Sequence, residues 1–158
     1  MQSQIYAYSD ASWNVVPIPF DGHAVIYGGA AVSYSARKVK IVPQSSAEAE
    51  TAAYSKVAKD VKYVVSVIGE SFQLKLSLPI HINCDNQAAV SSIKNNGTTQ
   101  RNRHYERWLQ LGREQYLDKV STPMWIKTDV MIADIFTKSL DKTAFLKFRS
   151  ALLNYKNK

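Results

Sequence analysis

The feature that most constrains the fold is a change in the spacing of apolar residues at Ser45. Before this residue lie three short segments with the alternation and composition of strands, at Ile5–Ser9, His23–Tyr27 and Ala30–Ala36. After it, apolar side chains recur every three or four positions as far as Ile68, which is the spacing of one face of a helix. The chain is therefore expected to begin with three strands and to continue with a long helix.

Local signals between these segments agree with this order. Gly28 and Gly29 stand between the second and third strands, where a tight hairpin turn needs residues that adopt positive φ. Ser46, followed by Glu48 and Glu50, is typical of a helix start, because acidic side chains favour the positive end of the helix dipole. The first three strands are thus predicted to form an antiparallel meander that leads into the helix.

The rest of the chain alternates between strand and helix patterns. The segments expected there are a strand at Ile80–Cys84, a short helix starting within Asp85–Val90, a helix over 103–119, a strand at Pro123–Thr128, a short helix at Met131–Leu140 and a final helix around Phe145–Leu152. Strands that are linked through helices pair in parallel. The prediction is one α/β domain, residues 1–158 with a core of about 5–150: a mixed five-stranded sheet, a meander of three strands plus two parallel strands, with helices on both faces.

Positive charge gathers toward the end of the chain. Residues 101–158 carry 12 Lys and Arg against 6 Asp and Glu, whereas residues 1–100 carry 8 against 7. Such an asymmetry indicates a polyanionic partner, with plain solubility as the alternative. The apolar fraction of 46% excludes a disordered chain, and the single cysteine, Cys84, excludes an intramolecular disulfide. No apolar run approaches the length that spans a membrane.

Four carboxylates occupy positions where they can meet. Asp10 follows the first strand, Glu50 lies in the first turns of the long helix, Asp85 follows the fourth strand, and Asp134 lies in the helix after the fifth. Each taken singly also has a structural explanation, as a helix cap or a partner of the helix dipole. Clustered carboxylates raise each other's pKa, and a hard cation such as Mg²⁺ relieves their repulsion. On a basic protein, such a site indicates metal-dependent cleavage of nucleic acid.

Four blocks of sequence carry a resemblance to a known family. They are Tyr8–Trp13 (YSDASW), Gln44–Glu50 (QSSAEAE), Cys84–Ala89 (CDNQAA) and Ile132–Lys138 (IADIFTK). In this order and spacing, they resemble the ribonuclease H domain of copia-type LTR retrotransposons, within the type 1 ribonuclease H superfamily. The resemblance implies a ribonuclease H fold and an endoribonuclease that cleaves the RNA strand of RNA/DNA hybrids during reverse transcription.

The resemblance also implies a catalytic and metal-binding tetrad. Asp10, Asp85 and Asp134 match three of its members, and the tetrad would hold two Mg²⁺ ions, for which Mn²⁺ can substitute. For the fourth member we assign Glu50, because the family's helix carries Ala three residues after the Glu, a pattern that Glu48 does not fit. The implied products carry a 5′-phosphate and a 3′-hydroxyl.

Other matched positions are expected to contact the nucleic acid. They are Ser45, Ser46, Asn86, Gln87, Arg101, Arg103 and His104, with Arg107 and Lys138 as further candidates for phosphate contacts. Hydroxyl groups before the long helix can bond the RNA 2′-hydroxyl, and cationic side chains can bond phosphate. Helix capping is an equally good explanation for the serines and for Gln87.

The chain departs from the family pattern in two places. Lys127–Ala133 has no His before the last Asp, although many type 1 ribonucleases H have one there. The basic protrusion of some bacterial members is also missing. The resemblance implies a reverse transcriptase before this domain in the parent polyprotein, and the start at Met1 favours an excised domain or a free-standing relative. The expected location is the cytoplasm, in a virus-like particle, or the nucleus, with no membrane partner.

Two other functions stay open on the sequence alone. A catalytically silent module that binds hybrids or supports a reverse transcriptase would have the same fold, and metal binding distinguishes the enzyme from it. A DDE integrase, which has the same type of fold, fits less well. Such an enzyme expects a final Glu on a long helix, whereas this chain offers Asp134 on a short one.

Overall fold

The computed structural model places five strands in one sheet. It describes residues 4–13, 18–40, 42–95, 97 and 103–155. The strands are β1 (Ile5–Ala11), β2 (Phe20–Tyr27), β3 (Ala30–Lys38), β4 (Ile80–Cys84) and β5 (Ser121–Trp125), in the spatial order β3-β2-β1-β4-β5. β1, β2 and β3 pair antiparallel, whereas β4 lies parallel to β1 and β5 lies parallel to β4. The predicted mixed five-stranded sheet is confirmed.

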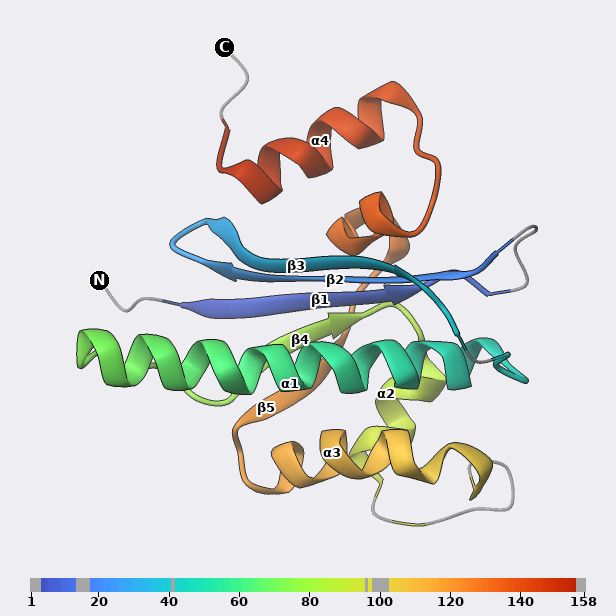
Figure 1. Ribbon diagram of the computed structural model, residues 1–158, viewed down its shortest axis with the longest axis horizontal. Helices are drawn as coiled ribbons and strands as arrows, with labels where there is room; N and C mark the ends of the chain where they lie inside the picture. Colours follow the sequence, from blue (N-terminus) through green and yellow to red (C-terminus); the bar gives the residue numbers. More distant parts are fainter. Residues whose placement is uncertain (1–3, 14–17, 41, 96, 98–102, 156–158) are drawn as a thin grey trace.

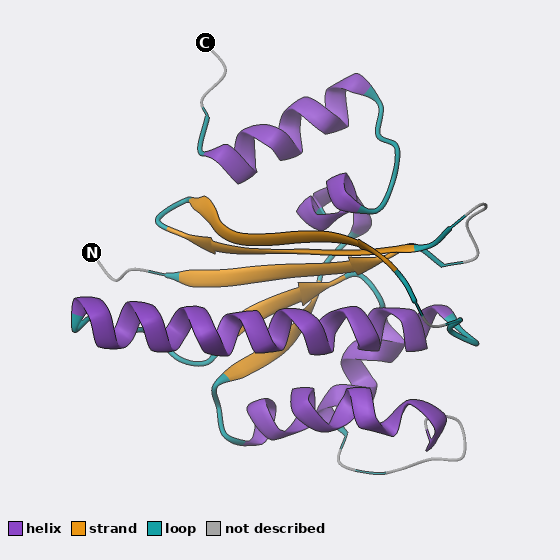
Figure 2. Ribbon diagram, viewed as in Figure 1, coloured by secondary structure: helices purple, strands orange, loops and turns teal. Residues whose placement is uncertain are grey.

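Helices cover both faces of this sheet (Figure 1, Figure 2). One face carries α1 (Ser46–Phe72), α2 (Gln87–Lys94) and α3 (Glu106–Leu117), with the 3₁₀ turn η1 (Arg103–Tyr105) before α3. The other face carries α4 (Lys142–Leu153). Two 3₁₀ turns, η2 (Thr128–Val130) and η3 (Ile132–Phe136), connect β5 to this helix. Within the described ranges, no helix is long and apolar enough to cross a membrane.

The main core lies between the sheet and α1. The helix directs Tyr54, Val57 and Val61 toward it, and all three are fully buried in one cluster with apolar side chains such as Ile82 of β4 and Leu109 of α3. A fully buried valine or leucine contributes about 1.5–3 kcal/mol relative to an exposed one. The three-and-four spacing of the sequence is thus the spacing of the residues that fix α1 against the sheet.

β1 and β2 are longer than predicted. β1 continues to Ala11 because Asp10 and Ala11 still pair with Gly22 and Asp21 of the antiparallel neighbour, and β2 starts at Phe20 because this residue pairs with Lys38 of β3. The local alternation of apolar residues ends earlier, so it does not reveal this extra pairing. As a result Asp10 lies inside a strand, where the ladder fixes the direction of its side chain.

The segment after α3 also differs from its predicted bounds. The last strand spans Ser121–Trp125 rather than Pro123–Thr128, because Ser121 already pairs with Ile80 of β4. The helix predicted at Met131–Leu140 is the tighter turn η3, in which the backbone bonds span mostly three residues. This turn is short and places its side chains against the end of the sheet.

A close approach at Gly22 holds η3 against β2. A Cβ atom at this position would collide with the Cβ of Phe136. Because glycine has no side chain, η3 can lie directly on the strand beside β1. The position of Asp134, which lies in the same turn, follows from this contact.

Candidate active site

Three carboxylates from distant parts of the chain converge at one edge of the sheet. Asp10 lies in β1, Asp85 follows β4 and Asp134 lies in η3, and one carboxylate oxygen of each lies within 4.8 Å of the others. The parallel pairing of β1 with β4, in which Tyr8 faces Asn83, brings the ends of these strands together. Asp10 and Asp134 are buried, so water screens their mutual repulsion only weakly.

Glu50 lies next to this cluster, on α1. Its Oε1 accepts a hydrogen bond from the backbone N–H of Ala11 at 3.1 Å, and its Oε2 accepts a weak one from the Cys84 thiol at 3.7 Å. Burial, together with the charge of Asp10, raises the pKa of Glu50 to about 9. At neutral pH the carboxyl group therefore keeps a proton unless a cation enters the site.

Lys138 is the cation that balances the cluster in this structure. Its Nζ donates a hydrogen bond to Oδ1 of Asp134 at 2.8 Å and lies 3.5 Å from Oδ1 of Asp10. Burial alone would lower the pKa of Lys138, but these two carboxylates raise it. Burial raises the pKa of Asp134 to about 6 although the hydrogen bond from Lys138 opposes the shift. One ammonium group thus offsets only part of the cluster's negative charge.

Hydroxyl groups orient two of the three aspartates. The Thr137 hydroxyl donates a hydrogen bond to Oδ2 of Asp10, and both groups are buried. The Thr128 hydroxyl donates to Oδ2 of Asp85 at 2.9 Å, while the indole N–H of Trp125 donates to the Asp85 carbonyl at 3.1 Å. The aspartates are therefore held in place before any ligand binds.

The alternative role of Asp85 as a helix cap is wrong. The N-cap of α2 is Asn86, whose Oδ1 accepts a hydrogen bond from the N–H of Ala89 at 3.0 Å. Because the helix is capped by the next residue, the carboxylate of Asp85 does not bond the helix start and can face Asp10 and Asp134.

Glu48 has a structural role at the start of α1. Ser45 is the N-cap, and its Oγ accepts a hydrogen bond from the N–H of Glu48 at 3.1 Å. Oε2 of Glu48 in turn accepts from the backbone N–H of Gln44 at 2.8 Å, in the manner of a capping box. The two glutamates of α1 thus do different things, because Glu50 reaches the end of β1 and Glu48 reaches back along its own chain.

The predicted nucleic-acid contacts lie around the starts of α1 and α2. Oγ of Ser46 lies 3.5 Å from Nδ2 of Asn86, which joins the two helix starts, and Gln87 is exposed beside them. Arg103 is exposed in η1. Arg101 lies outside the described residues, as does the side chain of His104. The contacts of all these residues with nucleic acid stay a prediction.

The groups that surround the carboxylates were not predicted from the sequence. Thr137 and Lys138 belong to the last of the four sequence blocks, but Lys138 was expected to contact phosphate rather than the aspartates. Thr128 carried no signal. Apart from the bond between Lys138 and Asp134, which are four residues apart, these contacts join residues distant in the chain, as the bond from Thr137 to Asp10 does, so local spacing does not report them.

The donor set of this site fits a magnesium ion. Asp10, Asp85 and Asp134 offer carboxylate oxygens, which are the ligands that Mg²⁺ and Mn²⁺ prefer, at a separation that a shared cation can bridge. Asp10 and Asp134 are ion-paired to Lys138 here, so a divalent cation would compete with an ammonium group for the same oxygens. Among the described residues, no softer donor except the Cys84 thiol lies close, and burial keeps that thiol protonated by raising its pKa.

Two curated retrotransposon polyproteins are similar in sequence to this chain. No family model matches it. The retrovirus-related Pol polyprotein from transposon RE1 of Arabidopsis thaliana is 29% identical over 151 residues, which cover 94% of this chain and 10% of the relative. The polyprotein from transposon RE2 of the same plant is 29% identical over 147 residues, covering 91% and 10%. The chain thus spans about a tenth of the length of these curated relatives.

Solved structures show the same fold. The N-terminal ribonuclease H domain of a Mycobacterium tuberculosis protein has a TM-score of 0.65 at 9% identity and covers 95% of this chain and 99% of that one. LC11-RNase H1 in complex with an RNA/DNA hybrid has a TM-score of 0.60 at 13% identity, covering 85% and 94%. The fold is a ribonuclease H fold. With the transposon relatives, this confirms the predicted resemblance: the chain fits the ribonuclease H domain of a retrotransposon.

Proposed function

We propose that this chain is a metal-dependent endoribonuclease that cleaves the RNA strand of RNA/DNA hybrids. The observation that carries the proposal is the convergence of Asp10, Asp85 and Asp134 at the end of the parallel strand pair. Such a group of carboxylates repels itself strongly unless it binds cations. A solved protein of the same fold binds an RNA/DNA hybrid, and this supports the same substrate class here.

Asp10, Asp85 and Asp134 would hold two Mg²⁺ ions, with Glu50 beside them as the fourth carboxylate, and Mn²⁺ would substitute. When bound, the metal supplies a Lewis acid that activates water and stabilises the leaving oxygen. Hydrolysis on this pattern leaves a 5′-phosphate on one fragment and a 3′-hydroxyl on the other.

The side chains around the site contribute orientation and charge. Thr137 and Thr128 fix the carboxylates of Asp10 and Asp85, so that little reorganisation is needed when a cation binds. Glu50 would lose its proton to solvent when positive charge is bound beside it, because its raised pKa reflects burial and the unbalanced charge of Asp10. The ammonium group of Lys138 would then no longer be needed to balance the carboxylates.

The wider context is also proposed. In the parent polyprotein a reverse transcriptase would precede this domain and supply hybrids during reverse transcription. The Pol polyprotein relatives support this setting, because the chain matches about a tenth of each of these much longer proteins. The location that fits this setting is the cytoplasm, within a virus-like particle, with the nucleus as a further compartment.

A cleavage assay with an end-labelled RNA/DNA hybrid tests the proposal. The parent protein should cut the RNA strand in Mg²⁺ or Mn²⁺, leave the DNA strand intact, and lose activity in EDTA. Asp85→Asn should lose activity, whereas Asp118→Asn, the same change at an exposed residue at the end of α3, should keep it.

Three outcomes of this assay would contradict the proposal. They are cleavage of the DNA strand, full activity in EDTA, and a parent protein that binds both Mn²⁺ and hybrid without cutting. The last outcome would identify a catalytically silent hybrid-binding module instead.

A further inference from the structure

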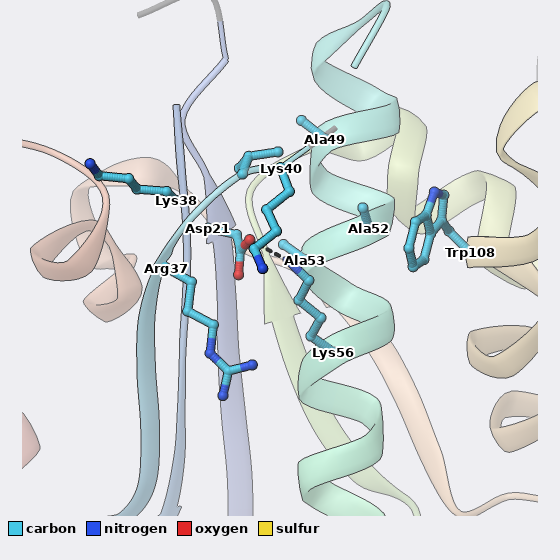
Figure 3. A pocket seen from close by; sticks show the side chains of 10 residues that line it. Asp21, Arg37, Lys38, Lys40, Ala49, Ala52, Ala53, Lys56 and Trp108 are labelled. Carbon is cyan, nitrogen blue, oxygen red and sulfur yellow. Dashed lines mark hydrogen bonds and ion pairs between the residues drawn. The ribbon is translucent and has the colours of Figure 1, made fainter. Parts of the chain in front are cut away.

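A cavity lined by both apolar and charged side chains lies on the α1 face of the sheet, apart from the three aspartates (Figure 3). Its volume is about 530 Å³, within the range of sites that bind small ligands. Three small residues of α1, Ala49, Ala52 and Ala53, line it, together with Trp108 of α3, which lies on the opposite side of α1 from Asp21 in Figure 3. The remaining lining comes from β2, from the end of β3 and the residues after it, and from Lys56: Asp21, Arg37, Lys38, Val39 and Lys40.

The charge of this cavity is strongly positive and only partly balanced. Lys56 donates a hydrogen bond to Oδ2 of Asp21, which is the one carboxylate among the described lining residues. Among the described residues, Arg37, Lys38 and Lys40 have no acidic partner. Figure 3 shows Arg37 and Lys40 on either side of Asp21, while Lys38 points away from α1. The cavity therefore favours an anionic ligand.

A buried acceptor in the same cavity has no donor. Asp21 is 2% exposed, and its Oδ1 has no hydrogen-bond partner in the part of the chain that the structure describes. An unsatisfied buried carboxylate oxygen is costly, so a ligand that brings a hydroxyl or amino donor to it gains affinity. The ligand should thus combine negative charge with a hydrogen-bond donor, as a sugar–phosphate unit does.

The cavity adjoins the aspartates across one strand. Asp21 pairs with Ala11 in the β1–β2 ladder, and Ala11 follows Asp10 directly. Ala11 also packs against Ala49 and Ala53, which line the cavity. Each strand of a duplex presents a phosphate for about every 3.4 Å of its axis. A duplex held at the aspartates would therefore carry further phosphates past this cavity.

We propose that the cavity binds a sugar–phosphate unit of the RNA strand, with the phosphate on Arg37 and Lys40 and a ribose hydroxyl donating to Oδ1 of Asp21. The RNA strand is the occupant because an internal deoxyribose has no hydroxyl to donate, whereas ribose has one. This inference rests on the proposed function for its substrate, but it concerns residues outside the carboxylate cluster. It gives the chain a second contact with the hybrid.

Site-specific alkylation tests the contact directly. The only cysteine, Cys84, is fully buried, so Lys40→Cys creates a single reactive thiol beside the cavity. In EDTA, to prevent cleavage, saturating RNA/DNA hybrid should slow alkylation of this thiol at least fivefold, and duplex DNA should protect it less. The matched control is Lys62→Cys, at an exposed position on the second half of α1, which should react at the same rate with and without hybrid.

A charge-removal experiment gives a second measurement. In the double variant Arg37→Ala, Lys40→Ala, the slope of log affinity against log salt should become shallower by roughly 0.7–0.9 for each phosphate that is no longer neutralised. The control double variant Lys62→Ala, Lys75→Ala should have the same slope as the parent. The inference is overturned if saturating hybrid does not slow alkylation of the Lys40→Cys thiol. It is also overturned if the double variant has the same salt slope as the parent. Equal protection by duplex DNA overturns the ribose contact. If the protein cleaves the RNA strand but hybrid does not protect the thiol, only the proposed cavity contact is wrong. If hybrid protects the thiol but the protein does not cleave RNA, only the proposed function is wrong.

Discussion

Replacement of Lys138 by Met would show how much this one ammonium group stabilises the metal-free carboxylate cluster. The change removes the charge but keeps an unbranched side chain. Removing one partner of a fully buried ion pair costs about 3–5 kcal/mol, and an exposed pair is worth about 0–1 kcal/mol. Lys138 lies between these limits, because its side chain is 37% exposed whereas Asp10 and Asp134 are buried. We therefore expect a loss of about 2 kcal/mol.

The assay is thermal unfolding in EDTA at pH 8, followed by titration with Mn²⁺. A loss of about 2 kcal/mol corresponds to a melting temperature lower by about 4–8 °C for a chain of this size. Since the ammonium group no longer competes for the carboxylate oxygens, Mn²⁺ should bind about 30-fold more tightly, at tenfold per 1.4 kcal/mol. Lys142→Met, at an exposed position in the first turn of α4, is the matched control and should change neither quantity.

Two results would refute this reasoning. If Lys138→Met melts at the parent temperature in EDTA, the ammonium group does not stabilise the cluster. If Mn²⁺ binds the variant no more tightly than the parent, Lys138 does not occupy the position that a metal would take. The size of the melting shift should also shrink toward pH 5, because protonated carboxylates no longer need a counter-ion.

The same geometry leads to three further predictions. Glu50→Gln should abolish cleavage and raise the melting temperature in EDTA, because Gln is neutral in this buried site without the proton uptake that Glu50 needs on folding. Glu48→Gln should lose about 0.3–1 kcal/mol of stability at the helix start and keep cleavage, and the reverse pattern would contradict our assignment. The pKa values of Glu50 and Asp134, about 9 and about 6, are raised above those of the unfolded chain, so the stability they contribute is complete below about pH 4 and is lost as pH rises through 6 and then 9. Urea unfolding in EDTA between pH 5 and 9 should show this fall, which Mg²⁺ should cancel. Gly22→Ala should cost about 1–3 kcal/mol, because its Cβ meets Phe136, and an unchanged melting temperature would show that η3 moves freely.

The sheet and the aspartates at its edge were predictable from the sequence. Asp10 and Asp85 each follow a run of strand-forming residues, and parallel pairing of two such strands brings their ends together by topology alone. The choice of Glu50 over Glu48 needed the family resemblance, and the structure then gave Glu48 a separate capping role. Asp134 was placed in the right segment but in the wrong kind of turn.

The remaining features depend on contacts between distant residues. The sequence IADIF permits either a helix or a 3₁₀ turn, and the close packing of η3 on Gly22 of β2 accompanies the tighter form. The ion pair between Lys138 and Asp10 joins residues 128 positions apart, so local spacing carries no trace of it. The buried acceptor on Asp21 is likewise visible only once the β1–β2 ladder and α1 are assembled.

One property of strands relates the carboxylate cluster to the cavity lined by Asp21, Arg37 and Lys40. Successive residues of a strand point to opposite faces of the sheet, so Asp10 and Ala11 must serve different faces. Asp10 accepts its hydrogen bond from Thr137 on the side of η3, whereas Ala11 packs against Ala49 on α1 beside the cavity. A hybrid that reaches both must therefore lie across the end of β1 rather than along one face of the sheet. A single-residue insertion before Asp10 would exchange the two faces and destroy both contacts together.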